Sequence, residues 1–571
     1  MLLQLKVEKS TNIHSSECKI YFCILFFLSL CLVSLGNPVF VPYLSYPAAC
    51  IGYALFWLCL YFFGSTKKRF FVSGLWYFFV QLVQLSWMTA TEYQGNYILF
   101  IYVGIALFLG VQFGFLTLLL PKEKEQASNM EISRICAVAS CWTLIEWARL
   151  YVLCGFSLNT SGMALAVSPY SAQLASVFGL LALSFVVLFI NAYALRWLIF
   201  KSSFYRNKSF FLWCALASMP YLFGGAHYFF QKKQVSNSAT FQVCLVQTGL
   251  LPGEKSPLFG RAKEYISPWN QWKWILQSLK EHKNQDLIVL PETVVPFRMS
   301  DAIYSLEGVI KVFSEVLELD VKDFLPPLEW PYAEKKIFAD KESWQVSNAF
   351  WAQTLCNVLQ ADLIAGLDEK DLEEKKNYNA AFYFRPMCTT IERYEKRVLV
   401  PLAEYLPTVW LKPFVSRYGI SEFFTPGTEA KIFFGKVPFS VSICYEETFS
   451  DLIREGTRKG AQLLVNVTND NWYPDSLLPL HHYEQGRLRA IENGTPLIRA
   501  CNSGVTVAVD CLGETVARLQ QKECKKGVLV AQLPLYQYKT FYMIWGDAGI
   551  VAISFLFLLF FWKRRNKACF K

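Results

Sequence analysis

The sequence is poor in charge, in histidine and in paired cysteine motifs. Charged residues make up 18% of the 571 positions, whereas soluble domains usually carry about a quarter. The five histidines lack metal-site spacing, and the 17 cysteines form no Cys-x-x-Cys pair. Lysine and arginine do not alternate with aromatics along a basic stripe. We therefore expect no metal, no other cofactor and no nucleic-acid partner, and we do not expect an ordinary soluble protein.

Hydrophobic residues, in contrast, reach 54% and gather in long runs. No charged residue occurs from 20 to 64, a length that fits two membrane spans with a turn near Asn37-Pro38. The other apolar runs lie at about 70–90, 94–120, 135–155, 171–199, 209–229 and 541–562. The sequence thus predicts a polytopic α-helical membrane domain with about eight transmembrane helices, about seven of them before residue 233.

Basic residues predict how these spans are oriented, because short cytoplasmic loops retain Lys and Arg. The basic clusters follow the second, fourth, sixth and eighth spans: Lys67 to Arg69; Lys122, Lys124 and Arg134; Lys201, Arg206 and Lys208; and Lys563, Arg564, Arg565 and Lys567. This parity predicts a membrane domain over 1–233, an extracytoplasmic domain over 234–538, and a last helix with a cytoplasmic basic tail over 539–571. A cleaved signal peptide is the weaker interpretation of the first run, since no small-residue cleavage site follows it.

The segment 234–538 has the pattern of a soluble α/β domain. Short β-rich runs alternate with polar stretches compatible with helices. The clearest of these runs are Phe241 to Val246, Leu287 to Leu290, Phe439 to Ile443, Leu463 to Val467 and Val505 to Val509. The region from Ser300 to about Ser347 is acidic and aromatic without a clear period, and we interpret it as an insertion.

Three motifs in this segment place a reactive side chain at the end of a predicted strand. They are Leu290-Pro291-Glu292, Lys396 just before Val398 to Pro401, and Ile443-Cys444-Tyr445-Glu446. A cysteine after a buried strand is, by itself, more often a core thiol than a nucleophile. The Pro-Glu strand end and the lysine favour the catalytic interpretation, because strand ends of α/β sheets usually carry the site.

These residue types complement one another chemically. A thiol is mostly protonated at neutral pH, so a nucleophilic cysteine needs a base or a neighbouring cation. Glu292 can be that base for Cys444, and Lys396 can stabilise the oxyanion of a tetrahedral intermediate. No histidine is required.

A Glu-Lys-Cys set in this order resembles the carbon-nitrogen hydrolase (nitrilase-like) superfamily. Combined with the apolar spans, it is similar to the apolipoprotein N-acyltransferase family. The matching stretches include Trp142 to Trp147 with Arg149, Gly155-Phe156, Val400-Pro401, Glu404 to Pro407, Asn469 to Trp472, Arg487 to Glu492, Arg499-Ala500, and Asn502 to Val505.

The resemblance implies a fold and a set of site residues. The extracytoplasmic domain should be an αββα sandwich, with Glu292, Lys396 and Cys444 catalytic. Glu404 falls on the second essential glutamate of the family, and Tyr445 and Glu446 follow the nucleophile as its pattern requires. The alternative for Glu404 and Glu446 is an ion pair that only holds Lys396. Asn379 matches a polar position for which we expect a structural role.

The same resemblance implies the reaction and its partners. A membrane phospholipid would donate an acyl chain through a Cys444 thioester, and the N-terminal diacylglyceryl-cysteine of an apolipoprotein would accept it. The enzyme would be a monomer in the bacterial inner membrane, with its catalytic domain on the periplasmic side. Two alternatives remain: a membrane-anchored amidase or nitrilase whose thioester is resolved by water, and a transporter or lipid-binding protein with a vestigial domain.

Two ionisable residues lie within the fifth predicted span. Glu146 and Arg149 are three positions apart, so they can pair on one face of a helix. Ionisable groups at membrane depth are costly unless they are paired or face an interior cavity. We therefore expect an ion pair there.

Overall fold

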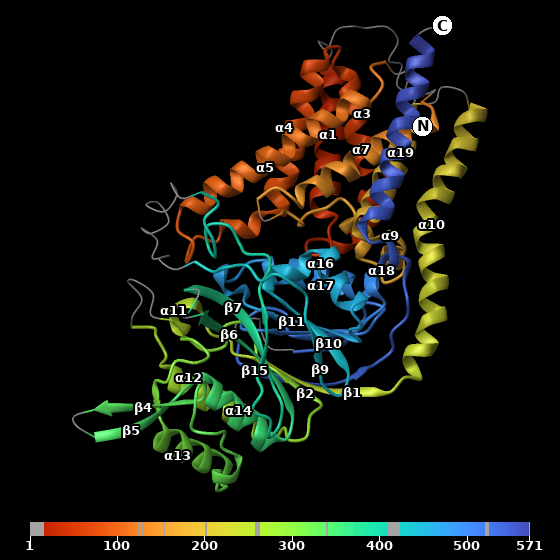
Figure 1. The fold of residues 1–571 in the computed structure, drawn as a ribbon. Helices are drawn as coiled ribbons and strands as arrows, with labels where there is room; N and C mark the ends of the chain where they lie inside the picture. The colour runs from red at the N-terminus through yellow and green to blue at the C-terminus, as the bar shows by residue number, and fades with distance from the viewer. Residues whose placement is uncertain are drawn as a thin grey trace.

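A helical part and an α/β part make up the protein in the computed structural model. The described residues are 16–123, 126, 130–153, 155–199, 203–256, 263–338, 341–371, 373, 375–408, 423–519 and 525–569. Lys124 and Lys201, which belong to two of the predicted basic clusters, lie outside them. Figure 1 shows the helical part above, with the α/β part below it.

Helices occupy every apolar run that the sequence predicts. In chain order they are α1 (Ser16–Leu35), α2 (Ser45–Pro47), η2 (Ala48–Gly52), α3 (Tyr53–Cys59), α4 (Thr66–Gln84), α5 (Tyr97–Leu116), α7 (Ile132–Arg149), α8 (Met163–Ala166), α9 (Ala175–Ile199), α10 (Ser203–Ser236), α18 (Phe541–Trp545) and α19 (Asp547–Cys569). The chain turns after Leu35, and the next helical segment begins at Pro42.

Fewer helices than predicted are long and apolar enough to cross a membrane. Among the described residues there are four: Pro42–Phe62, Tyr97–Leu119, Ser171–Ile199 and Asn207–Ser236, with a shorter apolar helix at Lys19–Leu35. Helix α4 begins with three basic residues, and α7 carries Arg134, Glu146 and Arg149. Because of these charges, neither helix is apolar enough to be counted as a membrane span. The count of eight spans therefore stays a prediction.

The C-terminal apolar run is broken. The sequence predicts one span over 541–562, but α18 ends at Trp545 and α19 begins at Asp547. Between them Gly546 has a φ of 56°, a left-handed conformation that glycine adopts without steric cost. A short helix therefore precedes the long one.

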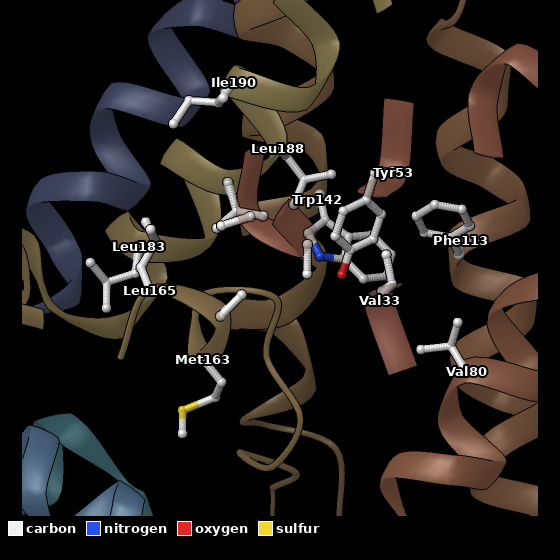
Figure 2. Close-up of a cluster of buried hydrophobic side chains, with 14 of the residues drawn as sticks. Val33, Tyr53, Val80, Phe113, Trp142, Met163, Leu165, Leu183, Leu188 and Ile190 are labelled. Carbon is white, nitrogen blue, oxygen red and sulfur yellow. The ribbon is translucent and has the colours of Figure 1, made fainter. Parts of the chain in front are cut away.

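The helical part has a core rich in aromatic rings. Phe56 stacks on Trp76 with ring centroids 4.1 Å apart, and Tyr77 stacks on Phe113 at 4.6 Å. Figure 2 shows Leu183, Leu188 and Ile190 in the same cluster. Leu488 and Ile491 of α17 (Leu478–Asn493) also belong to it. The helical and α/β parts thus share one apolar core.

Two six-stranded sheets form the α/β part. The first has the order β15 (Gly527–Pro534), β1 (Thr240–Gln247), β2 (Leu287–Val289), β6 (Asp362–Asp371), β7 (Lys376–Phe384), β8 (Glu392–Glu395). The second has the order β14 (Thr515–Arg518), β13 (Val507–Val509), β12 (Leu497–Cys501), β11 (Leu463–Thr468), β10 (Pro438–Ile443), β9 (Ile432–Phe434). The five strands predicted from the sequence are β1, β2, β10, β11 and β13.

The sheets lie face to face and carry helices on their outer sides. Val243 and Ile364 of the first sheet share a core with Phe439 and Val465 of the second. Helices α12 (Pro268–Leu279) and α14 (Asn348–Leu359) pack on the first sheet. Helices α16 (Ser450–Arg458) and α17 lie between the second sheet and the helical part (Figure 1). The domain is therefore an αββα sandwich, as the resemblance implies.

The predicted insertion forms a helix and a small sheet that pack against α12 and α14. It contains helix α13 (Leu306–Leu317) and a three-stranded sheet of β3 (Tyr304–Ser305), β5 (Lys341–Val346) and β4 (Ala333–Phe338). Figure 1 shows this unit at the end of the α/β part farthest from the helical part. It therefore contributes nothing to the junction between the two parts.

Candidate active site

The three predicted reactive side chains follow strands that run in the same direction within their sheets. Glu292 follows β2, Lys396 follows β8 directly, and Cys444 follows β10 directly. β2 runs parallel to β1 and β6, and β10 runs parallel to β11. Because carboxyl ends of parallel strands meet at one edge, the sandwich collects these residues at one end.

Lys396 is the centre of a buried ion cluster. Its Nζ lies 3.1 Å from Glu292 Oε1 and 2.8 Å from Glu404 Oε1, and its side chain is 1% exposed. Asn379 donates to both carboxylates, at 2.7 Å to Glu292 and 3.3 Å to Glu404. Asn379 is thus in direct contact with the site. The ion pair considered from the sequence exists for Glu404.

The cluster acts on the ionisation of the lysine and the thiol. Burial disfavours the Lys396 cation, but Glu292 and Glu404 outweigh this and raise its pKa well above the usual value. Burial also raises the pKa of the Cys444 thiol far above its ordinary range. Glu292 adds to this shift, and Lys396 opposes it. The resting site therefore holds a lysine cation and a protonated thiol, so nucleophilic attack requires a base.

Cys444 sits at a conformationally strained position. It is half-buried and begins a 3-10 turn, η10 (Cys444–Thr448), with a φ of 52°. A non-glycine residue in this region costs about 1–3 kcal/mol and persists only where its surroundings hold it. Such strain is typical of functional sites.

Glu446 holds that turn in place through the main chain. Its Oε2 accepts from Ile443 N at 2.8 Å and from the Tyr394 hydroxyl at 2.9 Å. Its Oε1 accepts from Arg397 N, and from Val398 N at 3.1 Å. Glu446 therefore joins the strand end before the nucleophile to the segment after Lys396, whereas Glu404 contacts the lysine itself.

Tyr445 points the other way, toward the helical part. Its hydroxyl donates to Gly155 O at 3.1 Å, in the loop that follows α7. Ser157 of the same loop donates to the Thr448 hydroxyl at 2.6 Å. The nucleophile turn is thus anchored on the helical part.

The loop after α7 is itself held by the predicted ion pair. Arg149 Nη2 lies 3.3 Å from Glu146 Oε1, and both side chains are buried, which confirms the pair. Glu146 also accepts from Ser161 N and from Trp142 Nε1, each at 2.8 Å. The pair therefore organises the loop that meets the nucleophile turn.

Sequence reasoning missed a buried network beside this turn. Asp470 Oδ1 contacts His482 Nδ1 at 2.7 Å, and Asp470 Oδ2 contacts Arg499 at 3.1 Å. Arg499 also contacts Glu447 at 2.8 Å. Burial would raise the pKa of Asp470, but His482 and Arg499 outweigh it and lower the pKa. Asp470 and Arg499 lie in stretches that resemble the family, whereas Glu447 and His482 gave no signal.

The cysteines and metal-ligating residues form no further site in the described part of the chain. None of the cysteine side chains described there is in a disulfide. Within the same residues, no group of three or more His, Cys, Asp or Glu side chains is arranged to hold a metal ion. The Glu292–Lys396–Cys444 region is therefore the candidate site.

Comparison with known families agrees with this arrangement. The model of the carbon-nitrogen hydrolase family matches residues 243–541, which include all the site residues of the α/β part. A Glu-Lys-Cys set at one end of an αββα sandwich thus lies within a carbon-nitrogen hydrolase domain. A second model, the apolipoprotein N-acyltransferase N-terminal domain, matches residues 32–193 in the helical part.

Curated relatives align over three quarters or more of the chain. An apolipoprotein N-acyltransferase of Chlamydia trachomatis is 32% identical and covers 92% of this chain and 94% of its own length. That of Chlamydia pneumoniae is 30% identical, with 94% and 95% covered. That of Haemophilus influenzae is 28% identical, with 76% and 74% covered. The chain belongs to the apolipoprotein N-acyltransferase family.

Proposed function

We propose that this protein transfers an acyl chain from a membrane phospholipid to the N-terminal diacylglyceryl-cysteine of a bacterial lipoprotein. The observation that carries the proposal is the buried contact of Lys396 with Glu292 and Glu404 at the end of the sandwich that holds Cys444, in a member of this family. The intermediate is an acyl thioester on Cys444.

The first step forms that thioester. Glu292 takes the thiol proton as the Cys444 sulfur attacks the ester carbonyl carbon of the phospholipid. Lys396 stabilises the oxyanion that develops on the carbonyl oxygen. The ester C–O bond then breaks, and Glu292 returns the proton to the leaving oxygen, which releases a lysophospholipid.

The second step forms an amide. The α-amine of the diacylglyceryl-cysteine attacks the thioester carbonyl and gives a proton to Glu292. Lys396 stabilises the second oxyanion, the C–S bond breaks, and the Cys444 thiolate recovers the proton. Glu404 keeps Lys396 in place during both steps, and Tyr445 and Glu446 keep the nucleophile turn in place.

The membrane arrangement is part of the same proposal. A membrane domain of 1–233 with about seven spans precedes a periplasmic catalytic domain of 234–538, and 539–571 form the last span and a cytoplasmic tail. Donor and acceptor are both lipid-anchored, so they reach a monomeric enzyme laterally in the inner membrane. A reporter fused near residue 536 should be active only on the periplasmic side; cytoplasmic activity would contradict this topology.

The covalent intermediate provides the test of the reaction. Incubation with phospholipid and no acceptor should load one acyl chain onto Cys444, and hydroxylamine should release it. Cys444→Ala should abolish loading, whereas Glu292→Gln and Lys396→Ala should slow it by about 10²-fold or more. An acyl group mapped to another cysteine would refute the assignment. Clearance by water as fast as by a lipopeptide amine would favour a hydrolase.

A further inference from the structure

The main chain at Glu292 adopts a strained turn. The residue after it, Thr293, has a φ of 41°. A β-branched residue in this region is a genuine outlier, and its cost has to be offset by the surrounding structure. What holds this turn therefore bears directly on the Glu292 carboxylate.

One side of the turn rests on strand β6. A Cβ atom at Gly366 would lie 2.6 Å from Glu292 Cα, so only glycine allows the approach. Val294 N donates to Gly366 O at 2.8 Å as the chain leaves the turn. The Thr293 hydroxyl donates to Asp368 Oδ1 at 3.2 Å. These contacts hold the turn against strand β6.

The other side is held by two donors to a single carbonyl. Glu292 O accepts from Lys255 Nζ at 3.0 Å and from Asn502 Nδ2. Asn502 is itself tied down, because its Oδ1 accepts from the Thr248 hydroxyl at 2.8 Å and its N donates to Thr468 O at 3.0 Å. The Glu292 carbonyl thus accepts hydrogen bonds from one residue that follows a strand of the first sheet and one that follows a strand of the second sheet.

Lys255 is an unusual choice for this position. It is 4% exposed and lies in α11 (Pro252–Lys255), the short helix after β1. Burial lowers the pKa of its ammonium to about 7, although the charges of Glu292 and Asp368 act in the opposite direction. A buried amine of this kind costs free energy unless its hydrogen bonds compensate. An apolar side chain would avoid that cost but could not donate to Glu292 O.

We propose that Lys255 is a positioning residue for Glu292. By donating a hydrogen bond to the Glu292 carbonyl, Lys255 keeps the Glu292 carboxylate 3.1 Å from Lys396 Nζ, where it can take the Cys444 proton. Lys255 acts through Glu292 and touches no reacting atom. This inference rests on the proposed function, because it takes Glu292 as the base of the acyl transfer.

The test uses the full-length enzyme and the variant Lys255→Met, which keeps an unbranched chain and removes the donor. The single-turnover rate constant for acylation of Cys444 by saturating phospholipid should fall about 10- to 100-fold, with little change in the phospholipid concentration that gives half of that rate, as expected for a misplaced catalytic group. The matched control is Lys280→Met, at a half-exposed lysine of the same domain, which should acylate at the wild-type rate.

A second background separates positioning from general damage. In Glu292→Gln enzyme no base remains to be positioned, so adding Lys255→Met should change the residual rate less than about twofold. An equal loss of rate in both backgrounds, or a wild-type acylation rate in Lys255→Met, would overturn the proposal. Asn502→Ala removes the other donor to Glu292 O, and it should slow acylation in the wild-type background but not in the Glu292→Gln background. If Asn502→Ala folds and is acylated at the wild-type rate, the proposal fails. This test remains available if Lys255→Met does not fold.

The failure of this inference is distinguishable from failure of the proposed function. If the wild-type enzyme never acquires an acyl group on Cys444, the acyl-transfer reaction itself is wrong. If the wild-type enzyme is acylated and the Lys255 and Asn502 variants are acylated equally fast, only the role of Lys255 is wrong. Alkylation of Cys444 by iodoacetamide gives a second readout that needs no phospholipid.

Discussion

Glu446→Gln should weaken both the stability and the rate of this enzyme. The carboxylate is fully buried and accepts four hydrogen bonds, two on each oxygen. Glutamine keeps the shape but can present only one oxygen. With that oxygen toward Arg397 N and Val398 N, the new amide group faces Ile443 N and the Tyr394 hydroxyl. The hydroxyl can turn and accept, whereas the Ile443 N–H loses its acceptor.

The magnitude follows from these four contacts. An unsatisfied buried N–H costs about 1–3 kcal/mol, and two bonds that change from charged to neutral acceptors each lose about 1 kcal/mol. Burial raises the pKa of Glu446, so removing the charge recovers some of that free energy. We expect a net loss of about 3 kcal/mol, which for a unit of this size corresponds to a melting point lower by roughly 3–5 °C. Because Cys444 begins the affected turn, acylation should slow by about 10²-fold.

Thermal melting followed by tryptophan fluorescence, together with single-turnover acylation, checks both values. Glu429→Gln is the control, since this side chain is 81% exposed and its replacement should change stability by less than about 0.5 kcal/mol. A wild-type melting point combined with a large loss of rate would refute the reasoning, because Glu446 would then act on the reacting atoms. A wild-type rate would show that its four contacts do not position the nucleophile.

Three further outcomes are expected. Glu404→Gln should lower kcat by about 10²-fold, because Lys396 loses its shortest charged contact; turnover near the wild-type value would leave Glu404 a structural partner only. Alkylation of Cys444 by iodoacetamide should rise about tenfold per pH unit from pH 7 to 9 without a plateau, since its raised pKa keeps the thiol mostly protonated throughout that range; a plateau near pH 8 would contradict the raised pKa. Ser157→Ala and Thr448→Val should each slow acylation, and the double variant should be no slower than either single one, as expected for a coupling of about 1 kcal/mol; additive effects would mean that their hydrogen bond does not link the two parts.

Local patterns predicted much of the fold. The strand ends with Glu292 and Cys444 lie where alternating β-rich runs end, and the helices begin and end near the predicted limits of the apolar runs. These features depend on near neighbours in the chain, so a single sequence carries them. The exception is the break between α18 and α19 at Gly546. It depends on the backbone conformation of one residue, and the apolar run around it is continuous, so the sequence pattern does not show the break.

Long-range polar contacts were less predictable. Glu404 contacts Lys396, and Asn379 of another strand contacts Glu404. Their residue types alone did not distinguish contact with the site from a structural role. Lys255 gave no signal, because a single lysine in a short segment after a strand is usually solvated. Its burial depends on how the ends of strands from both sheets converge, which no periodicity encodes.

The junction of the two parts bears on why such a site would transfer an acyl chain and not hydrolyse it. A hydrolase of the same superfamily needs the same base, lysine and nucleophile, so these residues cannot decide which molecule resolves the thioester. What this chain adds is a nucleophile turn that donates to Gly155 O through Tyr445 and bonds to Ser157 through Thr448. The shared apolar core extends from the aromatic rings of the helical part to α17. Tyr445, the residue after the nucleophile, packs against this core, so we expect the acyl chain of a Cys444 thioester to lie near apolar side chains that limit the access of water. Loosening this junction should therefore raise hydrolysis relative to transfer, even in variants whose Glu292, Lys396 and Cys444 are intact.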